Sequence, residues 1–394
     1  MKWKIELILD ENVYYPFIRL DEIRNDFQEH GYLGLSQLLQ ATIYSHTTHP
    51  VDRVIGLLGL ASQDARAHVK PSYDLTPSAV FATACLQVIN ETQCLDVLVG
   101  RWHHGINSKT HHEMYLFPSW IPNFASQIVD PHLSLYPASV RSAMDKKPQD
   151  DRASGGSAPR LHCKNGYVLQ LVGLLIDQVS SVQSRDLLEL DSHHDYHGVL
   201  EHLVDVVLPF VSNARTYSGP TLRHFCRTLA TSFIDADPDR CYVDQTHVSD
   251  RHRKHQAWEG DFGTFIHNML WLRGVTFGQP ASSHLSDEPP REDWFDEASK
   301  NWLSEVSEVL QQRVLFRTHK GYVGVADAGV QEGDIAIVPF GAAVPFLLGK
   351  AKHSSDARKQ YNLVDGCIIH GIMDGALIDA YETGEMMAET FEIV

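Results

Sequence analysis

The C-terminal part of the chain carries short β-type runs separated by glycine turns, and this pattern constrains the fold more than any other sequence feature. Each run has four or five residues and is rich in Val, Ile, Leu and Tyr. The runs are Val314–Thr318, Tyr322–Val325, Ile335–Val338, Val344–Leu348, Tyr361–Val364 and Gly366–His370. Strands this short at such regular spacing are typical of a small antiparallel barrel or sandwich.

A hairpin further upstream is expected to join this β structure. The pair Asn165-Gly166 lies between Leu161–Cys163 and the apolar run Tyr167–Ile176. Asn-Gly between two such runs indicates a type I′ turn, because both residues tolerate a positive φ. We therefore predict that a hairpin over 161–182 completes the C-terminal β structure.

The rest of the chain favours helices, because apolar residues recur there at three- and four-residue spacing. Such stripes cover Leu20–His30, Leu33–Ile43, Pro50–Leu60, the segment from Thr76 onward, Leu187–Phe210, Thr221–Ile234, Trp258–Leu272 and Asp293–Val314. No strand–helix alternation is visible. The predicted fold class is α+β: mainly helical, with a small antiparallel β-barrel or sandwich formed by the C-terminal strands and the 161–182 hairpin.

The polar stretch 145–160 (DKKPQDDRASGGSAPR) has no periodic apolar face. It is expected to be a linker or mobile loop. A chain of 394 residues is long enough for two or three cooperating units. The predicted division is a helical region at 1–144, the linker at 145–160, the hairpin with a second helical region at 161–312, and a C-terminal antiparallel β region with its tail at 313–394.

Charge and composition exclude several classes of partner. Fifty acidic against 33 basic residues give a formal net charge of −17, which argues against nucleic acid as the main partner. No stretch approaches the roughly 20 apolar residues needed to cross a bilayer, and no signal peptide is recognised at the N-terminus. The six cysteines form no Cys-x-x-Cys pair, which suits reduced thiols. We predict a cytoplasmic protein with no membrane span.

Several motifs, taken together in order, resemble fungal heterokaryon-incompatibility (HET) domain proteins. In the C-terminal part the matching segments are Phe316–Thr318, Gly321–Gly324, Gly333-Asp334, Gly341, Pro345–Leu348, Tyr361–Val364 and His370–Gly375. In the N-terminal part they are Pro50–Ala61 (PVDRVIGLLGLA), Pro71–Tyr73, Leu95–Leu98 and Pro118–Phe124 (PSWIPNF). The resemblance covers about residues 30 to 380, and it implies a fungal source and an intracellular location.

Two N-terminal motifs of the family do not occur in this sequence. One is a Tyr-x-x-Leu-Ser-Tyr-x-Trp-Gly-like strand, and the other is a Trp-Ile-Asp-x-x-Cys-Ile-x-Gln-like segment. Leu348-Gly349 also stands where the family has Leu-Arg. The resemblance therefore implies a HET-derived scaffold that lacks the core motifs linked to death signalling. It does not imply an incompatibility function, because function depends on sites and not on folds.

No motif for a cofactor or a nucleotide is present. The sequence has no Gly-x-x-x-x-Gly-Lys-Ser/Thr loop, no Gly-x-Gly-x-x-Gly after a strand and no Gly-x-Ser-x-Gly elbow. We therefore expect no cofactor and no metal. One alternative stays open: His193, His197 and Glu201 lie at i, i+4 and i+8, where they could ligate a metal or form a solvated polar face.

The aromatic residues allow either core packing or a ligand pocket. Candidate walls of an apolar pocket are Trp120, Phe124, Trp258, Phe262 and Trp271. Candidate polar, catalytic groups are Tyr217, Arg223 and His370; His370 could instead lock a turn with Asp374. A pocket of this kind can fold an apolar substrate into a reactive conformer and polarise a carbonyl. The first hypothesis is thus a cofactor-free cyclase or isomerase of fungal natural-product biosynthesis, such as a Diels–Alder-type pericyclase acting on a terpenoid or polyketide.

The alternative hypothesis is a non-catalytic protein of incompatibility or allorecognition. In that case the C-terminal β region would present a surface to a partner. The sequence leaves a homo-oligomer open under both hypotheses, and it names neither the substrate nor the partner.

Overall fold

The structure is a computed structural model, and its described residues fall in several ranges. They are 11–42, 45, 47–99, 117–125, 152–183, 313–327, 329–352, 359–369, 372–373 and 375–394. The helices predicted over 187–210, 221–234 and 258–272, and most of the one over 293–314, lie outside these residues. Whether the chain is mainly helical therefore stays a prediction.

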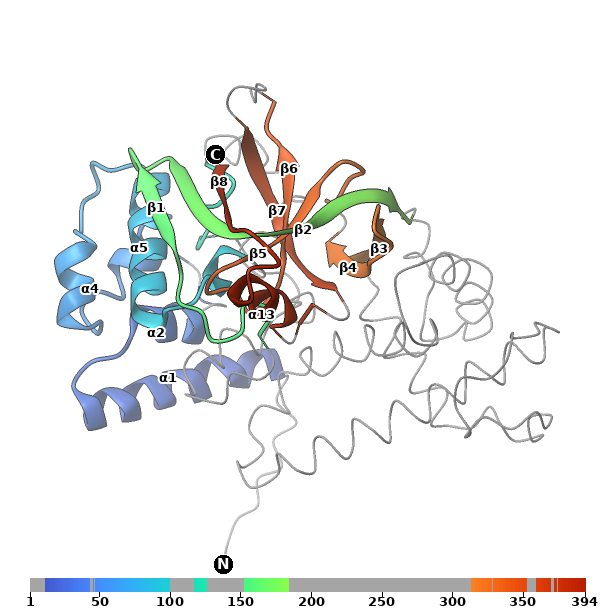
Figure 1. The fold of residues 1–394 in the computed structure, drawn as a ribbon. Helices are drawn as coiled ribbons and strands as arrows, with labels where there is room; N and C mark the ends of the chain where they lie inside the picture. Colours follow the sequence, from blue (N-terminus) through green and yellow to red (C-terminus); the bar gives the residue numbers. More distant parts are fainter. Residues whose placement is uncertain are drawn as a thin grey trace, which may run out of the picture.

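The N-terminal residues form a layer of helices, shown in blue and cyan in Figure 1. Its elements are α1 (Glu11–His30), α2 (Leu35–Ala41), α3 (Asp52–Ile55), α4 (Gln63–His68), α5 (Pro77–Thr92) and the 3₁₀ turn η1 (Asp96–Leu98). Helix α5 is the centre of the layer, and α2 and α4 pack against it. The helix predicted over 50–60 is shorter than expected, because after Ile55 the chain continues in turns that contain Gly56 and Gly59.

Helix α5 begins and ends where its sequence dictates. The Thr76 side chain accepts a hydrogen bond from the Ala79 N–H, and Pro77 occupies the first turn, where a missing N–H costs nothing. The helix buries Phe81, Cys85 and other apolar side chains against the β structure. It ends at Gln93, which has a left-handed backbone with φ of 51°.

The C-terminal β structure is antiparallel apart from one short parallel pairing, as the sequence predicts. The strands are β1 (Leu161–Lys164), β2 (Val168–Val182), β3 (Arg313–Thr318), β4 (Val323–Asp327), β5 (Ile335–Pro339), β6 (Phe346–Lys350), β7 (Gln360–Ile369) and β8 (Glu389–Ile393). The β1–β2 hairpin has positive φ at Asn165 and Gly166, 52° and 71°, which are the central positions of a type I′ turn. Two predicted runs merge into β7, while β8 and helix α13 (Ala376–Glu382) were not predicted.

The strand pairings form a closed circuit. Strand β2 pairs with β3, β3 with β4, β4 with β7, β7 with β6, β6 with β5, and β5 pairs again with β2. Strand β2 pairs with β3 and β5, and strand β7 pairs with β4 and β6, so these two long strands join the β3–β4 pair to the β5–β6 pair. In Figure 1, β2 runs through the circuit as one long curve. A register shift interrupts the β2–β5 pairing between Leu175 and Asp177, and another interrupts the β2–β3 pairing between Val179 and Ser181.

Both faces of the central strands are buried, because successive side chains alternate between two cores. In β5 and β6, Ile337, Phe346 and Leu348 belong to the core shared with the helical layer. Their neighbours Val338 and Leu347 point to the opposite face, together with Phe316, Cys367 and Ile369. This alternation follows from the period of two along a strand, and it explains why these strands read as continuous apolar runs.

The described half of the predicted linker packs against the β structure. The N–H groups of Ala153 and Ser154 donate to the carbonyl oxygens of Ala343 and Ala342, at 2.9 and 3.2 Å. Ala153 is fully buried. The conformation of residues 152–160 is therefore fixed by the loop between β5 and β6, whereas the division of the whole chain into domains stays a prediction.

No helix among the described ranges is both long and apolar enough to cross a membrane.

Candidate functional site

Two of the eight predicted site residues fall within the described residues. Trp120 and Phe124 belong to segment 117–125, which lies between the helical layer and the β structure. The other six, Tyr217, Arg223, Trp258, Phe262, Trp271 and His370, lie outside the described residues. The alternative metal ligands His193, His197 and Glu201 lie outside them as well.

Trp120 and Phe124 are fully buried core residues. The Phe124 ring lies edge-on to Phe81 of α5 at a centroid distance of 5.5 Å, and Phe81 in turn stacks on Phe117 at 6.0 Å. The indole N–H of Trp120 donates to the carbonyl oxygen of Tyr167 at 3.0 Å. Protein atoms cover both side chains completely, so they stabilise the junction of helices and strands; a role as pocket walls stays a prediction.

Ser119 connects the same segment to the two strands β7 and β8. Its hydroxyl donates to the carbonyl oxygen of Val394 at 2.5 Å and accepts from the Leu363 N–H at 2.8 Å. The Ser119 N–H donates to the same Val394 oxygen at 2.9 Å. One side chain thus joins segment 117–125 to both strands.

Asp96 makes the second connection between the layers. Its Oδ1 accepts from the Ala343 N–H at 3.0 Å, and the neighbouring Leu95 N–H donates to the Gly341 carbonyl oxygen at 3.0 Å. Burial raises the pKa of the Asp96 carboxyl, and hydrogen bonds from Cys94 and Ala343 and the charge of Arg152 partly offset this effect. The carboxylate therefore holds the loop between β5 and β6 at the end of the helical layer.

Arg53 is the third polar residue buried at this junction. Its Nε donates to the Phe124 carbonyl oxygen at 3.0 Å, and its Nη1 donates to the Ser45 carbonyl oxygen at 3.3 Å. Burial lowers the pKa of Arg53 to about 10, so the side chain stays positively charged at neutral pH. Arg53 thus connects the loop after α2 to segment 117–125.

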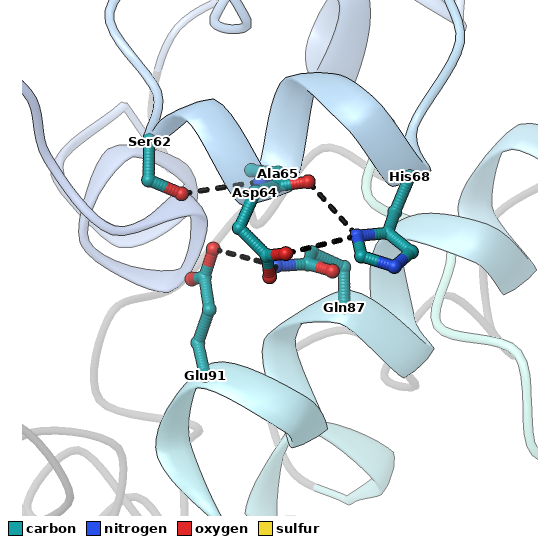
Figure 2. Close-up of polar contacts among 6 residues, drawn as sticks. All are labelled: Ser62, Asp64, Ala65, His68, Gln87 and Glu91. Atoms are coloured by element: carbon teal, nitrogen blue, oxygen red, sulfur yellow. Dashed lines mark hydrogen bonds and ion pairs between the residues drawn. The ribbon is translucent and has the colours of Figure 1, made fainter.

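A network of polar side chains joins α4 to α5 (Figure 2). Gln87 Nε2 donates to Asp64 Oδ2 at 2.9 Å and to Glu91 Oε1 at 3.1 Å. The second oxygen of Glu91 accepts from the Leu35 N–H at 2.8 Å, which satisfies a donor at the start of α2. His68 Nδ1 lies 3.3 Å from Asp64 Oδ1. The network thereby fixes α2, α4 and α5 to one another.

The chemistry open to this network is limited by its exposure. The side chains of His68 and Asp64 are 59% and 56% exposed, so solvent screens the pair. The contacts of these residues include no nucleophile held against the His68 ring. No cluster of His, Cys, Asp and Glu among the described residues could hold a metal ion. The geometry supports a structural or surface-binding role.

The comparisons with known proteins bear on the β structure just described. Residues 295–387 match the family model of the Het-6 beta-barrel domain. This family is related to HET proteins, so the predicted resemblance is confirmed for this segment, which we call the Het-6 segment. No curated protein and no solved structure matched the chain. The resemblance of the N-terminal part stays a prediction.

The Het-6 segment supplies only part of the circuit of strands. It contains β3 to β7 and α13. Strand β2, which pairs with both β3 and β5, comes from outside it, as does β8. The structure thus identifies an upstream strand as part of the unit that the Het-6 segment belongs to.

Arg53, Asp96 and Ser119 were not predicted as important residues. A signal was nonetheless present, because each is a polar residue inside an apolar motif that carries the HET resemblance: Pro50–Ala61, Leu95–Leu98 and Pro118–Phe124. The structure gives these motifs a physical role, since each one supplies a connection at the junction of helices and strands.

Proposed function

We propose that the β circuit is a barrel filled by its own side chains, and that barrel and helical layer together act as a HET-like, non-catalytic interaction module. The observation that carries this proposal is the filled interior. Five side chains on the inner face have no exposed surface: Phe316, Val338, Leu347, Cys367 and Ile369. Small barrels packed in this way hold no ligand chamber, unlike barrels that enclose a ligand.

The way in which the helices are attached to the barrel also supports a binding role. Ser119, Asp96 and Arg53 connect segments that lie far apart in the sequence. Connections of this kind hold the two layers in one arrangement, and a surface held rigid before binding loses less entropy when a partner docks.

The enzymatic hypothesis remains the second proposal. A cofactor-free cyclase or isomerase would use Tyr217, Arg223 and His370 as polar groups, and its pocket walls would be Trp120, Phe124, Trp258, Phe262 and Trp271. What favours it is the concentration of aromatic residues in the sequence between 258 and 271. Of these residues, Trp120 and Phe124 lie in the described part of the chain, where both side chains are fully buried.

Deletion of the gene in its source organism separates the two proposals. We expect an unchanged profile of small-molecule metabolites and an altered outcome of cell fusion between strains. Reintroduction of the wild-type gene should restore fusion behaviour, and so should a triple variant with Tyr217→Phe, Arg223→Met and His370→Ala. Accumulation of an uncyclised precursor that the wild-type gene removes, and the triple variant does not, would instead establish the enzyme.

A further inference from the structure

The tip of the β6–β7 hairpin is a basic surface on an acidic protein. Residues 350–359 (KAKHSSDARK) contain four lysine or arginine residues and one acidic residue, whereas the whole chain has 33 basic and 50 acidic residues. Lys350, Lys352 and Lys359 belong to the described residues, and all three are exposed. None of them forms an ion pair with a carboxylate of the described residues. Their charges are therefore available to an acidic partner.

The register of the hairpin places these three lysines on one face, which we call the lysine face. The Ala351 N–H donates to the Gln360 carbonyl oxygen at 2.9 Å, so these two residues oppose each other on the two strands. Lys350 and Lys352 flank Ala351, and Lys359 flanks Gln360. Successive side chains of a strand point to opposite faces, so the three lysines share the face opposite to Ala351. Like charges about 5–7 Å apart repel one another, and carboxylates docked on this face relieve the repulsion.

A complementary acidic surface lies on α13 and the turn after it. Three exposed carboxylates stand there at three-residue spacing: Asp379, Glu382 and Glu385. The 83% exposed Met387 follows them, and residues 376–394 contain no lysine or arginine. The nearby Arg160 places its guanidinium over the Phe340 ring at 4.2 Å and forms no ion pair with the three carboxylates. We call the three carboxylates and Met387 the α13 surface.

The lysine face and the α13 surface lie at opposite ends of β8. Helix α13 precedes the first residue of this strand, whereas Glu392 and Ile393 near its end pair with Gln360 and Tyr361 beside the hairpin tip. Figure 1 shows the same arrangement, with β6 and β7 rising toward the top of the view and α13 below them. No ion pair joins the two surfaces within one molecule. Both surfaces are therefore open to a second copy.

We propose that the lysine face docks onto the α13 surface of a second copy of this chain. Three cations then meet three carboxylates whose spacing is similar, about 5–7 Å on both surfaces. The aliphatic stems of the lysines cover the exposed Met387 side chain while their ammonium groups reach the carboxylates. If each copy supplies both surfaces, the contact closes into a two-fold dimer; otherwise it continues into a chain of copies.

A local acidic surface fits the lysine face better than an extended polyanion does. A nucleic acid or an anionic membrane continues beyond the three lysines and meets the acidic surface of a protein with a net charge of −17. Contacts between exposed charges are weak and are screened by salt. The docking is therefore reversible and strongest at low ionic strength. It does not rest on the proposed function, because it concerns self-association alone.

Sedimentation velocity of the full chain at several concentrations, at ionic strengths of about 0.02 and 0.5 M, tests the proposal. We expect the wild type to associate at the lower ionic strength and to be monomeric at the higher one. One triple variant reverses the lysine face (Lys350→Glu, Lys352→Glu, Lys359→Glu), and another reverses the α13 surface (Asp379→Lys, Glu382→Lys, Glu385→Lys). Each alone should lower the association constant at least about ten-fold.

The matched control reverses two exposed cations of the helical layer, Arg66→Glu and Lys70→Glu, and should associate like the wild type. The decisive sample is an equal mixture of the two triple variants, because each supplies the charge that the other lacks. This mixture should regain association at low ionic strength.

A wild type that stays monomeric at low ionic strength would overturn the proposal without recourse to any variant. So would a mixture that stays monomeric or a control that loses association, since general charge repulsion would then explain the single variants. Salt-sensitive binding of the wild type to phosphatidylserine vesicles, in place of self-association, would assign the lysine face to a membrane and overturn the second copy as its partner.

Discussion

At the scale of single residues, two buried charged groups of this protein lie where separate segments of the chain meet. Arg53 lies between the loop after α2 and segment 117–125, and Asp96 lies between η1 and the loop after β5. Charged residues are rarely buried, so general rules place both at the surface. Only their position inside the family-like motifs distinguishes them in the sequence, and it does not reveal which atoms they contact.

Asp96 gives a prediction about pH. The pKa of its carboxyl in the folded state is raised above the value of about 3.9 in an unfolded chain. Below both values the group is protonated in either state and has no effect. As the pH rises through the folded-state pKa, the folded protein must bury a charge, and stability is lost. Asp96→Asn keeps an oxygen for the Ala343 N–H but carries no titrating proton.

We therefore expect the free energy of unfolding of Asp96→Asn, relative to the wild type, to increase as the pH rises above about 4. Urea denaturation at several pH values measures this difference, and Asp74→Asn, at an exposed carboxyl, is the control. A difference that stays constant or decreases with pH would contradict the assignment.

At the scale of elements, β2 and β7 determine the architecture, because these two strands join the β3–β4 pair to the β5–β6 pair. Most strand positions could be predicted, since short apolar runs between glycines leave few other structures. Strand β8 (ETFEI) could not, because three of its five residues are polar and its pairing with β2 depends on distant residues. The sequence predicted that the 161–182 hairpin joins the C-terminal strands, but not that β2 pairs with β5 in particular, because this pairing joins residues far apart in the chain.

Gly324 of β4 tests how tightly the circuit is packed. A Cβ atom at this position would lie 2.4 Å from Cζ of Phe316 and 2.8 Å from the backbone oxygen of Ile368. The Phe316 ring is fully buried, and the neighbouring backbone belongs to β7, so neither can move freely. We expect Gly324→Ala to lower the free energy of unfolding by about 1–3 kcal/mol.

Chemical denaturation of purified protein provides the measurement. Gly59→Ala is the matched control, because no atom lies within 4 Å of its added Cβ. Equal stability of the two variants would show that the interior of the circuit yields to an added methyl group, and would weaken the interpretation of the barrel as filled.

At the scale of the whole molecule, helices and strands share one hydrophobic core. The cluster that contains Phe81 and Trp120 also contains Leu171, Phe346 and Phe391 of the β structure. The sequence indicated both halves, but it gave no information on how they meet, because the contacts join residues hundreds of positions apart, as Ser119 and Leu363 do. We therefore expect the layers to lose their structure together.

Ser119→Ala examines this coupling. The change removes one hydrogen-bond donor and one acceptor at the junction of segment 117–125 with β7 and β8. It should lower the free energy of unfolding by about 1–3 kcal/mol. Hydrogen exchange should become roughly ten-fold faster or more in β8 and around Leu363 as well as in residues 117–125. Ser72→Ala, which removes a single exposed contact, should leave all rates unchanged. Acceleration confined to residues 117–125 would contradict the coupling.

The pairing of β2 with β3 has an evolutionary consequence. The chain leaves β2 after Val182 and returns at Arg313, and Val182 pairs directly with Phe316. Both ends of the intervening stretch are therefore pinned side by side on neighbouring strands, and the entropic penalty of joining them grows only slowly with length. Insertions and deletions acquired in that stretch during evolution are therefore expected to cost little stability while β2 and β3 stay paired.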